Sequence, residues 1–112
     1  MPAPEYAVIL STCKTRAEAE SIATRLVTDG AAACVSIVDK ITSIYQWKGK
    51  VEKAAEALLI IKTRFALTDR VEGTIRGFSS YECPEVIVLP IVEGSDDYLR
   101  WISEVTMGGG TT

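Results

Sequence analysis

Two long runs rich in β-branched and aromatic residues, joined by a short polar turn, constrain the fold of this chain more than any other feature. The first run covers residues 34–38 and 41–47, and the second covers residues 51–63 and ends in LLIIKT. The turn at residues 48–49 (KG) predicts that the two runs form a β-hairpin. Residues 39–40 (DK) interrupt the first run, so we expect a bulge there. The hairpin is longer than is usual in a small domain.

Helical periodicity predicts the first of three helices between Thr15 and Gly30. Thr15 followed by Glu18 is a capping-box pattern, and Gly30 is a typical stop. The apolar face of this helix consists of positions 19, 22, 23, 26 and 27.

Two further helices and two further strands complete the expected elements. One helix carries an apolar face of Leu67, Val71, Ile75 and Phe78, and the last carries Leu99, Ile102 and Val105. Short apolar runs at residues 6–10 (YAVIL) and 85–89 (EVIVL) predict strands.

The element order βαββαβα predicts an α+β fold of the ferredoxin-like, split βαβ type. We expect an antiparallel sheet with helices on one face, in a single domain over residues 1–112, with flexible ends at 1–5 and 107–112. The other sheet face would then be uncovered. A long apolar hairpin with an uncovered face predicts self-assembly, although the pattern does not give the number of subunits.

Charge and apolar patterning exclude several classes of protein. The net charge is −3 with 12 basic residues and no basic stripe, which argues against nucleic-acid binding. The longest apolar run, residues 57–61, is too short to span a membrane.

The cysteines indicate a cellular location, and the absence of histidine limits the catalytic chemistry that is available. Three cysteines without CxxC spacing, and no recognisable signal peptide, favour a cytoplasmic location. The chain contains no histidine, so the most common general base is missing. A Ser-His-Asp triad is excluded, and we expect no enzymatic activity.

Several short segments, taken in order, resemble the CutA divalent-cation-tolerance family over about residues 6–105. They are TC at 12–13, AACV at 32–35, SIYQWKGK at 43–50, YECPE at 81–85, LPI at 89–91 and DYLRW at 97–101. The resemblance implies a homotrimer in which long hairpins pair between subunits. It also implies weak divalent-cation binding at subunit clefts, of copper type, so Cu(II) is a candidate ligand although no cofactor is obligatory.

One position departs from the family pattern. The family commonly has a histidine two residues before the tyrosine of the YExPE segment, where this chain has Ser79. Imidazole is the most common ligand for Cu(II) and Zn(II), so a site here can draw only on sulfur and oxygen.

The candidate metal ligands are Cys13, Glu82, Cys83 and Glu85. Cys13 precedes a helix N-terminus, where a thiolate is favoured. Paired carboxylates such as Glu82 and Glu85 suit a hard divalent cation. The competing interpretations are a buried small residue for Cys13 and a solvated strand entrance for the carboxylates. Cys34, within an apolar strand, is expected in the core.

Aromatic residues form the remaining candidates. The resemblance implies that Tyr81 lies in a cleft between subunits, and we group Tyr45, Trp47 and Trp101 with it as candidate cleft residues. The interpretation we favour for these rings, together with Tyr98, is packing at an interface, because Tyr and Trp bury much area and keep one polar end.

Three functions remain open at this point. The first is a trimeric metal-tolerance protein. The second is a PII-like signalling trimer that senses a small anion or nucleotide, although the two-residue turn at 48–49 is too short for the long loop of that family. The third is a scaffold whose main property is a stable trimer.

Overall fold

The elements of the chain follow the expected order. The computed structural model describes residues 4–108. Its elements are β1 (Tyr6–Cys13), α1 (Arg16–Thr28), β2 (Cys34–Trp47), β3 (Lys50–Arg64), a short 3-10 helix (Phe65–Leu67), α2 (Thr68–Phe78), β4 (Ile87–Pro90) and α3 (Asp96–Val105). The α+β class and the βαββαβα order are confirmed.

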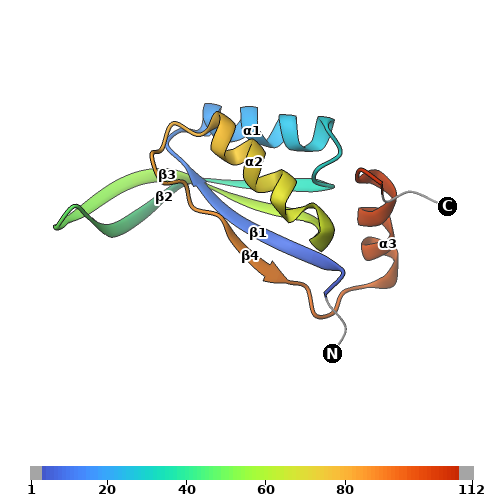
Figure 1. Ribbon diagram of the computed structural model, residues 1–112. Helices are drawn as coiled ribbons and strands as arrows, with labels where there is room; N and C mark the ends of the chain where they lie inside the picture. The colour runs from blue at the N-terminus through green and yellow to red at the C-terminus, as the bar shows by residue number, and fades with distance from the viewer. Residues whose placement is uncertain (1–3, 109–112) are drawn as a thin grey trace.

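The four strands form one antiparallel sheet in the order β2-β3-β1-β4. Helices α1 and α2 lie side by side over one face, while α3 lies at one end of the sheet (Figure 1). Strand β4 is at an edge and is shorter than residues 85–89 predicted. That edge position tolerates Pro90, which has no N–H to donate to a neighbouring strand.

The core lies between the sheet and the helices α1 and α2. Alternate residues of β1 are buried, as expected for a strand with one covered face. Ile9 and Leu59 from the sheet pack with Ile22, Leu26 and Ile75 from the helices. Cys34 does not belong to this core, contrary to expectation, because it is opposite Lys62 in the pairing of β2 with β3 and is only half-buried.

Local contacts explain where α1 begins and ends. The Oγ1 of Thr15 accepts a hydrogen bond from the backbone N–H of Glu18 at 3.1 Å, which confirms the predicted cap. Gly30 has a φ of +73°, the left-handed conformation that glycine adopts without steric cost. The backbone oxygen of Gly30 accepts a hydrogen bond from the N–H of Met107 at 2.6 Å.

The expectation of flexible ends falls partly on residues 1–3 and 109–112, which lie outside the described residues. Within the ends that were expected to be flexible, two of the described residues, Glu5 and Met107, form backbone hydrogen bonds. The oxygen of Glu5 accepts from Phe65, and Met107 donates to Gly30.

The hairpin of β2 and β3 extends away from the helices (Figure 1). Lys48 and Gly49 at its tip have φ angles of 50° and 83°, the left-handed pair that a two-residue hairpin turn requires. The pairing shifts register between Val38 and Ile41, which confirms the expected bulge.

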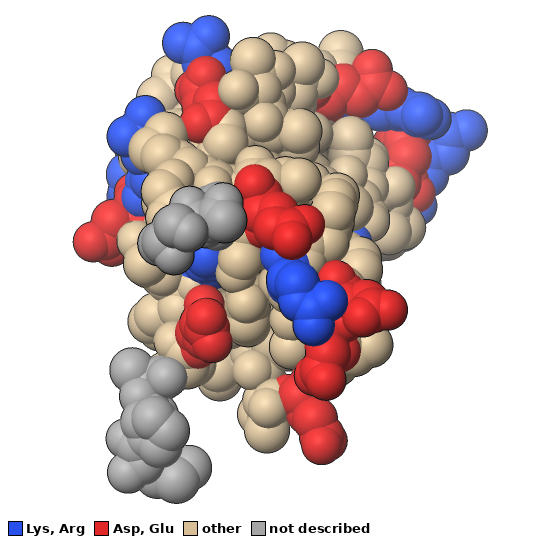
Figure 2. Space-filling view, turned by 90° about the vertical axis from the view of Figure 1, so that its right-hand side faces the viewer, with Lys and Arg blue, Asp and Glu red and all other residues tan. Residues whose placement is uncertain are grey.

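On the face that carries α3, acidic side chains gather at the lower right of the view, with a basic side chain beside them (Figure 2). Among residues 4–108, no helix is long and apolar enough to cross a membrane.

Candidate functional site

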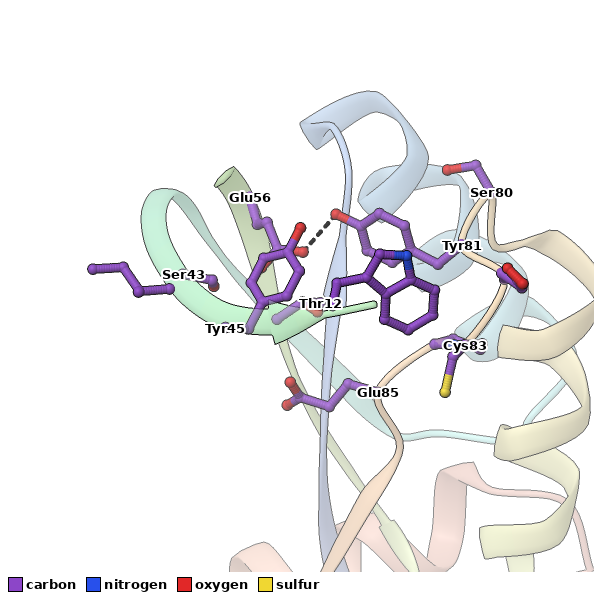
Figure 3. Close-up of a pocket in the computed structure, with 12 residues that line it drawn as sticks. Thr12, Ser43, Tyr45, Glu56, Ser80, Tyr81, Cys83 and Glu85 are labelled. Atoms are coloured by element: carbon purple, nitrogen blue, oxygen red, sulfur yellow. Dashed lines mark hydrogen bonds between the residues drawn. The ribbon is translucent and has the colours of Figure 1, made fainter. Parts of the chain in front are cut away.

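A pocket of about 720 Å³ lies between the hairpin and the segment that joins α2 to β4 (Figure 3). Its lining residues come from β1, from both hairpin strands and from that segment: Thr12, Ser43, Ile44, Tyr45, Trp47, Glu56, Ser80, Tyr81, Glu82, Cys83, Pro84 and Glu85. Most of the residues chosen from the sequence therefore meet here. Cys13 and Trp101 do not line the pocket.

The bulge in β2 determines which side chains of the hairpin reach the pocket. Val38 pairs with Leu58, and Ile41 pairs with Glu56, so β2 advances three residues while β3 advances two. Because side chains alternate between faces, the extra residue reverses the facing of the rest of β2. Tyr45 therefore projects on the same face as Glu56.

Glu56 is the residue that the sequence-based selection missed. Its side chain is largely buried, with 9% of the residue exposed. Its Oε2 accepts a hydrogen bond of 2.5 Å from the hydroxyl of Tyr81 (Figure 3). A glutamate within the otherwise small and apolar stretch 54–61 was the available signal, since an ionised carboxylate is rarely buried without a partner.

The electrostatic environment of the pocket is unfavourable for negative charge. Burial, and then the Glu56 carboxylate, raise the pKa of Glu85. Burial, and then the hydrogen bond to Glu56, raise the pKa of the Tyr81 hydroxyl, which therefore stays protonated as a donor. Every charged residue that lines the pocket is a glutamate: Glu56, Glu82 and Glu85. A cation in the pocket would relieve this repulsion.

Ser79, at the position where the resembling family commonly has histidine, shapes the backbone beside the pocket. Its Oγ accepts a hydrogen bond from the N–H of Tyr81 at 3.0 Å, a local turn that serine side chains favour. The N–H of Ser80 donates to the carboxylate of Glu18 on α1 at 3.3 Å. These two contacts orient the chain that presents Tyr81 and the residues after it.

Cys13 has an environment opposite to the one expected for a thiolate. Its side chain is in the core, with 1% exposed. Burial, followed by the charges of Glu18 and Glu56, raises its pKa to about 11. The expected effect of the helix N-terminus is outweighed, because moving a thiolate out of water costs more than the helix dipole contributes.

The other sulfur and aromatic candidates occupy different surroundings. Cys83 is exposed and lines the pocket. Trp101 lies on α3, where its ring centroid is 5.5 Å from that of Tyr98. That arrangement is aromatic packing within one chain, and the expected packing of these rings at an interface stays a prediction. Cys34 is near the ammonium of Lys62, with its sulfur 3.7 Å from Nζ.

A complete set of metal ligands does not occur within one chain over the described range. Between residues 4 and 108, no group of three or more Cys, Asp or Glu side chains is close enough to hold a metal ion.

Comparisons with known proteins place the chain in a family. A family described as CutA1 divalent ion tolerance protein matches residues 7–105. The chain is 42% identical over 95 residues to "Protein CutA" of Mus musculus, which covers 85% of this chain and 54% of that protein. It is 39% identical over 99 residues to "Divalent-cation tolerance protein CutA" of Thermus thermophilus, and the match covers 88% of this chain and 96% of that protein. The chain therefore spans about half the length of the first of these relatives.

Solved structures show the same fold. The divalent cation tolerance protein from Thermus thermophilus superimposes with a TM-score of 0.89 and 38% identity, covering 91% of this chain and 99% of that one. CutA1 from Oryza sativa superimposes with a TM-score of 0.91 and 38% identity, and the match covers 94% of this chain and 96% of that one.

Proposed function

The chain belongs to the CutA1 divalent ion tolerance family, and on that premise we propose that it is a homotrimer that binds a divalent cation, of copper type, at the pocket between its hairpin and the segment 80–85. The single observation that carries the proposal is the lining of this pocket, in which all the charged residues are carboxylates.

Glu82, Cys83 and Glu85 are the proposed ligands. All three line the pocket, but no three such side chains within residues 4–108 are close enough together to hold an ion, so one subunit would supply only part of the coordination, a sulfur or a carboxylate. Sulfur suits copper, while carboxylates suit harder divalent cations. Cys13 drops out of the proposed set, because it is buried in the core as a thiol with its pKa raised to about 11. A neighbouring subunit would complete the coordination.

Apolar residues on the sheet face opposite α1 and α2 support the proposed assembly. Val38, Ile87 and Leu89 lie on that face by strand alternation. In one chain their exposed fractions are 43%, 47% and 43%, respectively. Exposed apolar surface of this kind is typical of an interface. The number of subunits comes from the family resemblance.

We also propose that the protein acts by binding and not by catalysis, and that it is cytoplasmic. The location differs among relatives. One from Arabidopsis thaliana is named "Protein CutA, chloroplastic", and a structure from Archaeoglobus fulgidus is titled periplasmic. The alternative of sensing an anion or a nucleotide has less support, because the charged residues lining the pocket are all acidic.

The experiment has two parts. Light scattering should give a mass of three times the 12.1 kDa of one chain. Calorimetric titration of the chelator-treated protein with Cu(II) should then show saturable binding that Cys83→Ser or Glu85→Gln weakens. Glu104→Gln, an exposed glutamate on α3, is the matched control. A monomer contradicts the assembly, and equal binding by all variants contradicts the assigned ligands.

A further inference from the structure

The carboxylate of Glu56 is a buried charge without a basic partner. Only 9% of the residue is exposed, and among residues 4–108 no lysine or arginine forms an ion pair with it. The hydrogen bond from Tyr81 occupies Oε2. Burying an unpaired charge is costly, so a site that keeps one favours a positive occupant.

The dimensions of the pocket indicate more than a bare metal ion. A volume of about 720 Å³ is within the range of sites that bind small organic molecules. The pocket also includes the apolar residues Ile44 and Pro84, so part of its wall has no ligand to offer a metal.

Aromatic rings contribute to both walls of the pocket. Tyr45 and Trp47 belong to β2, and Tyr81 belongs to the segment after α2. In Figure 3 the hydroxyl of Tyr81 points at the Glu56 carboxylate, and the ring of Tyr45 overlaps that carboxylate in this view. Aromatic faces attract organic cations through the quadrupole of the ring. Trp47 already has one such contact, with the ammonium of Lys48 at 5.7 Å from its ring centroid.

We propose that this pocket binds an organic cation with N–H donors, of the alkylguanidinium or primary alkylammonium class, with Glu56 as the counter-ion and the ring of Tyr45, a lining residue of the same pocket, as its aromatic contact. The donors pair with the carboxylate oxygens, which accept bidentate hydrogen bonds from a guanidinium group. A quaternary ammonium ion has no N–H, so it would gain only the contact with the ring. This inference concerns the same pocket as the metal proposal but does not depend on metal binding.

The cation could be a free amine or the side chain of an arginine or lysine in another protein, and two probes separate these sources. Agmatine represents the free cation, and Nα-acetylarginine amide represents the side chain within a polypeptide. Each is titrated by calorimetry into the full-length, chelator-treated protein in its native assembly. Tetramethylammonium is the comparison that lacks N–H donors.

We expect saturable binding of at least one guanidinium probe, and binding of tetramethylammonium weaker by roughly tenfold or more. Glu56→Gln, which keeps the shape of the side chain, should lower the affinity for the guanidinium probe roughly tenfold or more. The matched control Glu104→Gln, on the exposed surface of α3, should leave it unchanged. Tyr45→Leu should lower the affinity by roughly 2- to 30-fold through loss of the ring contact.

The Tyr45 variant keeps the inference testable if Glu56→Gln does not fold. The inference is overturned if neither guanidinium probe binds saturably to the folded wild-type protein, or if a folded Glu56→Gln binds as tightly as the wild type. It is also overturned if tetramethylammonium binds as tightly as agmatine. A protein that binds agmatine without binding Cu(II) contradicts the metal proposal alone, and the reverse result contradicts only the organic cation.

Discussion

The hydroxyl of Tyr81 donates a hydrogen bond to the carboxylate of Glu56 across 25 positions of sequence, and this contact joins the two walls of the pocket. Glu56 belongs to the hairpin, whereas Tyr81 belongs to the segment between α2 and β4. The position of that segment therefore depends in part on one phenol and one carboxylate.

Replacement of Tyr81 by phenylalanine tests that contact. Removing the hydroxyl leaves a largely buried carboxylate without its donor, which costs about 1–3 kcal/mol of the free energy of unfolding. Urea unfolding at fixed protein concentration measures the loss. Tyr45→Phe is the matched control, because the structure shows no hydrogen bond at the Tyr45 hydroxyl within the described residues, and it should change stability little. Equal losses in both variants would contradict the assigned role of the contact.

The three cysteines should differ in their reactivity with a thiol reagent. At pH 8 the exposed Cys83 should react first, and Cys83→Ser should remove the fast phase. Cys13 should react last, because it is buried and its pKa is raised to about 11, so little thiolate is present. The measurement is the time course of labelling, with sites assigned by mass spectrometry. Fast labelling of Cys13 in the folded protein would be inconsistent with its position in the core.

The same thiol predicts a loss of stability in alkaline solution. The pKa of Cys13 is about 11 in the folded protein and 9.0 for the ordinary thiol, so between these values the folded state holds more protons than the unfolded state. The free energy of unfolding therefore falls as pH rises from about 9 to 11. Melting temperatures across this range should fall less steeply for Cys13→Ala than for the wild type, with Cys83→Ala as the control. Parallel curves would show that Cys13 does not titrate in this way.

Two glycines should respond oppositely to alanine. Gly30 has a φ of +73°, and a Cβ there would lie 3.1 Å from the Met107 nitrogen. Gly30→Ala should therefore cost about 1–2 kcal/mol. Gly73 is within α2 and a Cβ there would meet nothing within 4 Å, so Gly73→Ala should stabilise by about 0.4–1 kcal/mol. Thermal unfolding of both variants measures the two effects, and a loss at Gly73 would contradict the open surroundings assigned to it.

The sequence predicted the hairpin, its bulge, the cap at Thr15 and half of the residues that line the pocket, because each has a local signature. The turn at 48–49 and the interruption at 39–40 depend on backbone conformations that particular residues favour. Tyr45, Tyr81 and Glu85 came together in the pocket as candidate residues because the motifs that contain them lie at the hairpin and beside it.

Other features depend on which face a side chain occupies, and local patterns do not settle that. Cys13 was a candidate thiolate at a helix N-terminus, but its alternation along β1 turns it into the core, which is the competing interpretation of a buried small residue. Cys34 looked like a core residue, but its pairing with Lys62 places it on the other face. The sequence did not predict a buried Glu56, because its burial depends on a hydrogen bond from Tyr81, 25 positions away. Trp101 was grouped with the pocket although α3 packs elsewhere.

The extra residue in β2 has an effect like that of a frameshift within a single strand. Upstream of it the even-numbered residues such as Val38 face the same way as Leu58, and downstream the odd-numbered residues such as Tyr45 face the same way as Glu56. Loss of one residue at 39–40 would turn Tyr45 and Trp47 to the opposite side without changing either of them. A change in the number of residues at 39–40 would therefore remove the rings of Tyr45 and Trp47 from the pocket even if every residue that lines it were kept.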